Sequence, residues 1–232
     1  MEAIVLAGGL GSRLRGIVDD VPKPMAPVQG RPFLAFLLDQ LVAAGFKTAI
    51  FAVGYRHEAI RSHFGDDYRG MALLYSVESE PLGTGGAIRR AYELASVADV
   101  FVLNGDTYIE LDHRAMIDQH VRRNAQLTMA VCQVPNVSRY GAREVSEGIV
   151  RGFREKGQSG PGWINGGTYV LGAGLRDRLA GRVTFSFEQE LLMPEVESIR
   201  PGAFPASGLF IDIGVPADYA RAQQLFAERA TR

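Results

Sequence analysis

A glycine-rich turn near the start of the chain carries the residues that could do chemistry. The apolar run Ile4 to Ala7 opens into Gly8-Gly9-Leu10-Gly11-Ser12-Arg13, and Pro22-Lys23-Pro24 follows. Backbone N–H groups can approach a phosphate closely where a glycine turn follows a strand. Arg13 and Lys23 stand at opposite ends of this loop, so they could neutralise phosphate oxygens or a leaving pyrophosphate. The pattern predicts a loop that handles polyphosphates.

Three commoner glycine motifs do not fit this loop. The dinucleotide fingerprint G-x-G-x-x-G fails because Leu14 stands at the third glycine position. The P-loop fails because Ile17 and Val18 stand where a lysine and a hydroxyl residue are required. The hydrolase pattern G-x-S-x-G does not occur in the sequence, so Ser12 is a poor candidate nucleophile. An oxidoreductase that binds a dinucleotide is therefore disfavoured.

A tight connection between a strand and a helix is the simpler interpretation of the glycines alone. It leaves both cations and the two prolines around Lys23 unexplained. Proline fixes its own φ angle and biases the preceding residue away from the helical region. We therefore expect Lys23 on a stiffened, extended segment.

Two carboxylates could hold a hard cation. Asp106 follows the buried strand pattern Val100 to Leu103, where a turn-stabilising role is an equally good interpretation. Asp212 interrupts the apolar run Leu209 to Gly214, where an unpaired charge would be costly. Magnesium commonly takes one or two carboxylates together with phosphate and water. The pair predicts a magnesium site.

A second glycine cluster, Glu80 to Ala87, precedes a helical pattern. Thr84 is expected to cap that helix, and the three glycines exceed what a cap requires. We therefore expect them to allow close contact with a flat base or a sugar. Glu155-Lys156 and Asn165-Gly166-Gly167 are weaker candidates, because solvated hairpin ends would account for both equally well.

Composition excludes several classes of function. The 232 residues include 25 basic and 26 acidic ones, which gives no global field for a nucleic acid or an anionic membrane. The single cysteine, Cys132, lies in an apolar run and is expected to be a buried thiol in a reducing compartment. The four histidines lack metal-ligand spacing, so packing or surface roles are expected for them.

Targeting signals are not expected either. A strand pattern begins within three residues of the N-terminus, so we expect no signal peptide and a cytoplasmic location. No apolar stretch approaches the roughly 20 residues that span a bilayer. A homo-oligomer remains possible on this sequence.

Strand and helix patterns alternate through the first half of the chain. Strands are expected at 3–6, 49–53, 72–77 and 99–103, and helices at 33–44, 57–64, 84–95 and 112–123. Such alternation predicts an α/β fold with a mostly parallel mixed sheet flanked by helices. In open sheets of this kind, ligands bind beyond the carboxyl ends of the strands. Each motif of the first half follows such an end.

The pattern changes near residue 126. Strands are expected at 126–134, 143–145, 149–154 and 163–171, and helices near 187–193 and 216–228. We expect one domain, 1–232, whose first half, 1–125, carries the phosphate-handling motifs. The other half, 126–232, is expected to be a smaller α+β part that closes over the sheet.

With these motifs in order, the chain resembles the sugar-1-phosphate nucleotidylyltransferases. Their pattern L-A-G-G-x-G-[ST]-R-L followed by P-K-P appears as Leu6 to Leu14 and Pro22 to Pro24. The likeness continues through most of the chain and is greatest to the D-glycero-α-D-manno-heptose 1-phosphate guanylyltransferases. Further matching segments are 81–86, 104–107, 139–141, 155–156, 165–167 and 210–214. The resemblance implies a Rossmann-like, GT-A-like nucleotidyltransferase fold, with a nucleotide-binding half at 1–125 and a mainly sugar-binding half at 126–232.

The resemblance also implies an activity and a site. A sugar 1-phosphate would attack the α-phosphorus of a nucleoside triphosphate, with Mg²⁺ as cofactor, giving an NDP-sugar for surface-glycan synthesis and pyrophosphate. Arg13 and Lys23 would be catalytic, and Asp106 with Asp212 would hold the metal. The nucleotide would contact Leu6, Ala7, Gly8, Gly9, Gly11, Ser12, Arg13, Gly83, Thr84, Gly85 and Asp106, and the sugar Asn104, Gly141, Glu155, Lys156, Asn165 and Gly166.

One departure from the family pattern and several alternatives remain. Arg143 stands where a small or apolar residue usually follows the Arg-Tyr-Gly turn, which puts the local sugar contacts in question. GTP and the heptose phosphate are the favoured substrates. Mannose 1-phosphate guanylyl transfer and uridylyl or thymidylyl transfer are the alternatives. A non-catalytic nucleotide-sugar sensor is a different class of function that the same fold could serve.

Overall fold

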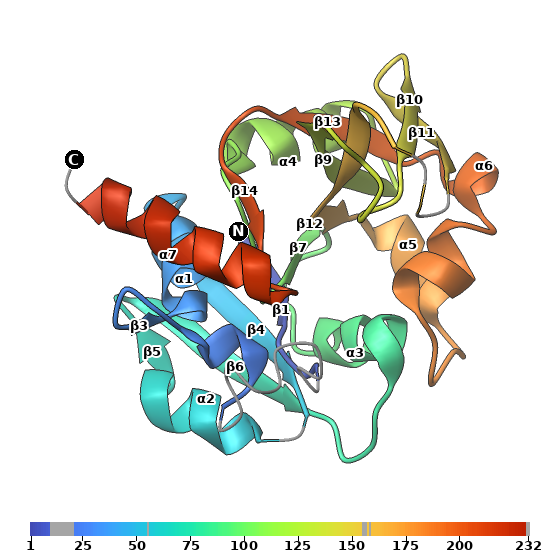
Figure 1. Cartoon of the computed structure of the whole chain (residues 1–232). Helices are drawn as coiled ribbons and strands as arrows, with labels where there is room; N and C mark the ends of the chain where they lie inside the picture. Colours follow the sequence, from blue (N-terminus) through green and yellow to red (C-terminus); the bar gives the residue numbers. More distant parts are fainter. Residues whose placement is uncertain (10–20, 55, 155–156, 158, 231–232) are drawn as a thin grey trace.

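A single mixed sheet of ten strands organises the protein (Figure 1). The computed structural model describes residues 1–9, 21–54, 56–154, 157 and 159–230. The strand order is β10-β11-β13-β9-β12-β7-β1-β4-β6-β5. Helices cover both faces of this sheet, which confirms the predicted α/β fold.

The first half supplies the parallel part of the sheet. Its strands are β1 (Glu2–Leu6), β4 (Thr48–Val53), β6 (Met71–Val77) and β7 (Val100–Asn104), and β1 pairs in parallel with both β4 and β7. Their nearly continuous apolar runs are typical of strands that are buried on both faces. The helices between them are α1 (Phe33–Ala43), α2 (His57–Phe64), α3 (Gly83–Tyr92) and α4 (His113–Arg122).

The second half extends the same sheet, so the expectation that it closes over the sheet is wrong. Strand β12 (Gly162–Leu171) pairs antiparallel with β7 on one side and with β9 (Leu127–Val134) on the other. β13 (Gly202–Ala206) is parallel to β9 and next to β11 (Ile149–Phe153), which pairs with β10 (Arg143–Ser146). The strands of the second half are thus added to the free edge of β7 through its pairing with β12.

Short elements complete the chain. β8 (Thr107–Ile109) pairs antiparallel with β14 (Phe210–Asp212) apart from the large sheet. A π-helical segment, η3 (Phe187–Leu192), covers the face of α3, and α7 (Pro216–Ala230) packs near α1 (Figure 1). The other elements are η2 (Lys23–Met25), β2 (Pro27–Val28), β3 (Arg31–Pro32), β5 (Asp67–Tyr68), α5 (Ala173–Leu179) and α6 (Val196–Ile199).

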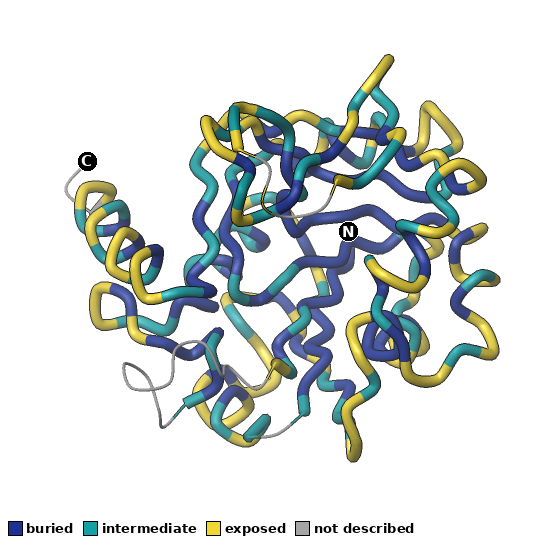
Figure 2. The backbone as a smooth tube through the Cα atoms, turned by 45° about the vertical axis from the view of Figure 1, so that its right-hand side comes forward, coloured by how far each residue is buried: buried dark blue, intermediate teal, exposed yellow. Residues whose placement is uncertain are grey.

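The alternation of β1 divides the core into two layers. Ala3 and Val5 face the cluster that includes the α1 leucines, whereas Ile4 faces the cluster that includes Ile88 of α3 and Leu175 of α5. In Figure 2 the central strands are mostly buried, whereas exposed residues lie mainly on loops, on outer helix turns and on strands near the edges of the sheet. Both clusters draw residues from both halves of the chain.

Candidate active site

The carboxyl ends of the parallel strands meet at a cavity of about 800 Å³. The residues after β1, β4, β6 and β7 all contribute to its wall, as the strand-end rule predicts. The candidates that line it are Leu6, Ala7, Gly8, Gly9, Lys23, Gly83, Thr84, Asn104 and Asp106. Gly11, Ser12 and Arg13 lie outside the described residues.

Two glycines bring these strand ends close together. A Cβ atom at Gly8 would lie 3.2 Å from the backbone N of Gly54, so a side chain there would push the two loops apart. A Cβ atom at Gly105 would lie 2.7 Å from the carbonyl oxygen of Leu6, to which the Gly105 N–H donates. This contact brings Asp106 to the end of β1.

The glycines at the start of α3 have a different partner from the predicted one. A Cβ atom at Gly83 would lie 2.5 Å from the Phe185 carbonyl oxygen, and one at Gly85 would lie 2.1 Å from the Phe185 ring. Gly86 approaches Val183 in the same way. Close packing on the 183–185 segment therefore accounts for the three glycines without a ligand. Gly83 still lines the cavity, whereas Gly85 does not.

Thr84 does not cap α3, so that expectation is wrong. The N-cap residue is Leu82, which makes no side-chain capping bond. The Thr84 hydroxyl instead accepts a hydrogen bond from the backbone N–H of Phe187 at 2.9 Å. The threonine ties the start of η3 to the rim of the cavity.

Lys23 joins the two predicted metal ligands. Its ammonium forms an ion pair with Asp106 and lies 3.8 Å from Oδ1 of Asp212. Asp212 reaches this position because β14 pairs with β8, which places it opposite Thr107. The Lys23 side chain is 15% exposed, so the three charges meet in a partly desolvated place.

The segment that holds Lys23 is a 3₁₀ turn, so the predicted extended conformation is wrong. Pro24 occupies the first turn, where its missing N–H would have had no helical partner. The N–H of Met25 donates to the carbonyl of Pro22, and that of Ala26 to the carbonyl of Lys23. The prolines still stiffen the segment, but as a turn.

Burial dominates the electrostatics of Asp212. Desolvation raises the pKa of its carboxyl, and the nearby negative charge of Asp106 raises it further. The Lys23 ammonium and the Gly214 N–H, which donates at 2.7 Å, oppose these effects. A second cation beside this pair would favour the ionised form in the same way.

The candidates for the sugar lie along β12 and beside it. Asn165 Oδ1 accepts the N–H of Gly167 at 2.9 Å, and a Cβ atom at Gly167 would lie 2.9 Å from Nδ2 of Asn104. Asn165, Gly166 and Gly141 do not line the cavity of about 800 Å³, whereas Asn104 does. Gly141 has a φ of 76°, and its N–H closes a turn onto Val137. Glu155 and Lys156 lie outside the described residues.

Sequence reasoning missed polar residues on the cavity wall. Arg56, His57 and Glu58 line it just after β4, where the strand-end rule would have indicated them. Glu78 also lines it after β6, and its carboxyl accepts the Leu82 N–H at 3.3 Å. Burial raises the pKa of Glu78 above its ordinary value.

The buried thiol and two histidines serve packing, as predicted. Burial raises the pKa of Cys132 to about 12. His120 lies within 2.9 Å of the Thr128 hydroxyl, and His113 packs edge-on to Phe46 with ring centroids 5.3 Å apart. Burial lowers the pKa of His113 to about 4.

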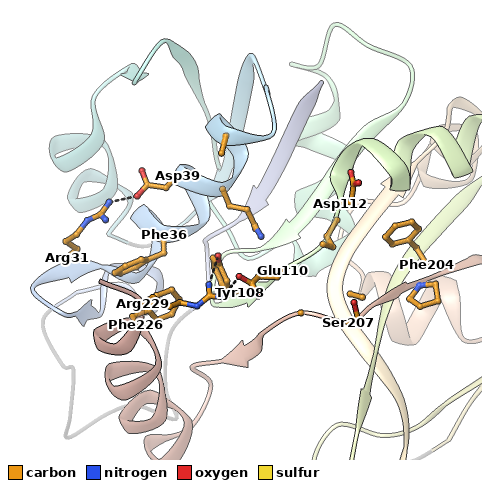
Figure 3. Close-up of a pocket in the computed structure, with 16 residues that line it drawn as sticks. Arg31, Phe36, Asp39, Tyr108, Glu110, Asp112, Phe204, Ser207, Phe226 and Arg229 are labelled. Atoms are coloured by element: carbon orange, nitrogen blue, oxygen red, sulfur yellow. Dashed lines mark hydrogen bonds and ion pairs between the residues drawn. The ribbon is translucent and has the colours of Figure 1, made fainter. Parts of the chain in front are cut away.

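A second cavity, of about 890 Å³, lies between α1, α7 and the end of β13 (Figure 3). Its two arginines each meet a carboxylate: Arg31 lies 2.7 Å from Asp39, and Arg229 pairs with Glu110. Among the described residues, its lining shares nothing with the first cavity. Of the described motif residues, Gly8, Gly9, Lys23 and Asp106 line the first cavity and not the second.

The described residues lack two further features. None of the helices there is both long and apolar enough to cross a membrane. Within the same part of the chain, no cluster of three or more His, Cys, Asp or Glu residues could hold a metal. A metal at Asp106 and Asp212 would need ligands from substrate or water, as magnesium accepts.

Comparison with known proteins agrees with this geometry. The Nucleotidyl transferase family matches residues 2–229, and the chain belongs to this family. It is 41% identical to the D-glycero-α-D-manno-heptose 1-phosphate guanylyltransferase of Aneurinibacillus thermoaerophilus over 97% of both chains. It is 40% identical to the enzyme of that name from Campylobacter jejuni, over 94% of this chain and 97% of the relative.

A solved structure extends the comparison to the fold. HddC from Yersinia pseudotuberculosis superposes with a TM-score of 0.88 at 36% identity, covering 97% of this chain and 99% of HddC. HddC complexed with GMP-PN superposes with a TM-score of 0.85 over the same shares. The fold is thus that of an enzyme family that transfers nucleotidyl groups.

Proposed function

We propose that the protein transfers a guanylyl group from GTP to D-glycero-α-D-manno-heptose 1-phosphate, releasing pyrophosphate and giving a GDP-heptose for surface-glycan synthesis. One observation carries the proposal: Lys23 and Asp106 line the cavity formed by the family's strand-end motifs, and Lys23 joins Asp106 to Asp212. The names of the two heptose 1-phosphate guanylyltransferase relatives support the choice of substrates.

The chemistry requires charge neutralisation more than a base. The second pKa of a phosphate monoester is about 6, so the attacking phosphate is ionised at neutral pH. Lys23 would neutralise the phosphates that meet at the reacting centre, and Arg13 would stabilise the triphosphate. The main contributions are thus positioning and electrostatic stabilisation.

Mg²⁺ would be held by Asp106 and Asp212. The donor set fits, because it consists of carboxylate oxygens and leaves room for phosphate and water ligands. Bound there, the ion would draw charge from the α-phosphate. Lys23 already offsets one of the two negative charges, so it would moderate the affinity of the pair for a divalent cation.

The remaining candidate residues would contact either the nucleotide or the sugar. The position of Glu78 on the cavity wall supports guanine as the base, because a carboxylate can accept hydrogen bonds from both N1–H and N2–H₂ on the edge of guanine. The backbone at Leu6, Ala7, Gly8, Gly9, Gly11, Ser12, Gly83, Thr84 and Gly85 would contact the nucleotide. Asn104, Gly141, Glu155, Lys156, Asn165 and Gly166 would contact the sugar.

Other substrates and a sensor role are the alternatives. Mannose 1-phosphate would keep the same chemistry, as would UTP or dTTP. A sensor would bind a nucleotide sugar without turnover. We predict that the protein is located in the cytoplasm and that it can form a homo-oligomer.

The test measures pyrophosphate release with Mg²⁺ for GTP, UTP, dTTP, CTP and ATP, each paired with heptose, mannose and glucose 1-phosphates. The highest kcat/KM is expected for GTP with the heptose phosphate. Absence of turnover with every pair would overturn the enzymatic proposal. Tight binding of GDP-heptose without turnover would favour the sensor.

A further inference from the structure

Arg143 is a buried arginine next to the candidate sugar residues. It begins β10, directly after the turn that contains Gly141, and its side chain is 4% exposed. Its guanidinium lies over the Phe153 ring at 4.7 Å from the centroid. Nη1 donates to the carbonyl oxygens of Gly141 and Ala142, both at 3.3 Å. Arg143 thus fixes the backbone of the Gly141 turn.

The same guanidinium reaches the other side of the sugar region through Glu188. Arg143 Nη2 donates to Oε1 of Glu188 at 2.8 Å, and Asn165 Nδ2 donates to Oε2 at 2.8 Å. Glu188 follows Phe187, whose N–H is held by the Thr84 hydroxyl. One carboxylate therefore joins β10, β12 and the rim of the nucleotide cavity.

This arrangement decides which way the Asn165 amide faces. Its two Nδ2 hydrogens go to Glu188 and to the Tyr169 hydroxyl, which is 2.5 Å away. Its oxygen accepts the Gly167 N–H at 2.9 Å and keeps one lone pair. The amide thus has an acceptor, and no spare donor, for a ligand. A sugar hydroxyl donates to such an acceptor.

Stability alone is a poor reason for an arginine here. Its buried Nε has no hydrogen-bond partner within the described structure. An unsatisfied buried donor is costly, and a buried ion pair can often be replaced by apolar residues without loss of stability. The Arg143–Glu188 pair therefore points to a role in the site.

Resting on the function proposed above, we propose that Arg143 is a positioning residue for the sugar 1-phosphate. It holds the Gly141 turn and, through Glu188, orients Asn165 as a hydroxyl acceptor. Without the guanidinium, Glu188 would lose its charge partner, and the Asn165 amide would be held less firmly on that side. The sugar would bind less tightly, whereas the nucleotide cavity would be unchanged.

The test compares Arg143→Met, Arg143→Lys and Glu188→Gln with the wild type. Arg143→Met should raise KM for the sugar 1-phosphate by up to about tenfold, as expected for loss of the hydrogen bond that Asn165 would accept from the sugar, with KM for GTP within twofold. Arg143→Lys should recover part of this loss. Glu188→Gln should resemble Arg143→Met, because one oxygen of the carboxylate becomes an NH₂ donor that faces another donor.

Arg178→Met is the matched control. Arg178 also pairs with a glutamate, Glu195, at 2.6 Å, on a different helix and without contact to Asn165. We expect this variant to lose stability without a change in KM for the sugar. An unchanged sugar KM in Arg143→Met, or an equal rise in both KM values, would overturn the proposal. If that variant does not fold, Glu188→Gln and Arg143→Lys decide by the same criteria.

Titration calorimetry with heptose 1-phosphate separates this proposal from the proposed function. Absence of turnover in the wild type would overturn the proposed function, whereas weaker sugar binding in Arg143→Met would still support the positioning role. Equal affinity in the two proteins would overturn the positioning role. Absence of binding to the wild type would overturn both.

Discussion

Removal of the Lys23 ammonium should change turnover and metal affinity in opposite directions. Lys23→Met keeps an unbranched side chain that is one atom shorter and removes the charge between Asp106 and Asp212. Loss of one preorganised group that stabilises developing negative charge typically lowers kcat by about 10²–10³. We expect a decrease of this size, because the reacting phosphates would lose a cation.

The two carboxylates would then lose the cation that offsets their negative charge. Two unit charges about 4 Å apart interact by about 4 kcal/mol at an effective dielectric constant near 20. The two aspartate side chains are 32% and 33% exposed, so solvent screening should leave about 1–2 kcal/mol of this. That energy corresponds to about a 5- to 30-fold lower half-saturating Mg²⁺ concentration.

The assay is pyrophosphate release across a range of Mg²⁺ concentrations. Lys47→Met is the control, since Lys47 is exposed and lies outside the cavity lining; its kcat and Mg²⁺ dependence should equal those of the wild type. A kcat for Lys23→Met within threefold of the wild type would refute the role of the ammonium. A higher half-saturating Mg²⁺ concentration would refute the electrostatic reasoning.

Three further predictions concern stability and base choice. His113 has a pKa of about 4 when folded and about 6.5 when unfolded, so below pH 6.5 the unfolded chain binds the extra proton and the unfolding free energy falls. Urea unfolding from pH 7 to pH 4 should show His113→Phe losing about 3 kcal/mol less than the wild type; parallel losses would contradict this. Gly85→Ala should destabilise the fold by about 1–3 kcal/mol through the clash with Phe185, and Phe185→Leu should relieve part of that cost in a double-mutant cycle, whereas strict additivity would exclude the clash. Glu78→Gln should lower the preference for GTP over UTP in kcat/KM by about tenfold or more, and an unchanged ratio would remove Glu78 from base recognition.

The first half of the fold could be predicted because its signals are local. The helix expected at 33–44 is observed at Phe33–Ala43, and the one expected at 57–64 is observed at those bounds. Apolar runs define the parallel strands, and their carboxyl ends then gather the motifs without further information. Neither step depends on residues distant in the sequence.

In the second half, the strands predicted at 126–134, 143–145, 149–154 and 163–171 are observed as β9, β10, β11 and β12. How these strands pair could not be predicted, because the pairing joins residues that are distant in the sequence. β13 was missed because it is short and contains Pro205, which weakens a strand pattern. The packing of Gly83 and Gly85 on Phe185 was not predicted, because Phe185 lies about a hundred residues away in the chain. The pattern of a single sequence cannot reveal which distant side chain approaches a glycine.

Asp212 shows why part of the site could be inferred without its topology. A lone carboxylate in an apolar run must be compensated whatever its neighbours are, and this cost led to the prediction of a metal beside Asp212. The ion pair with Lys23 was not predicted, because it depends on the β8–β14 pairing that brings Asp212 to the ammonium. Two carboxylates and one ammonium leave a single net negative charge. Such a group attracts a divalent cation that arrives with phosphate, while the ammonium keeps the empty pair from strong self-repulsion.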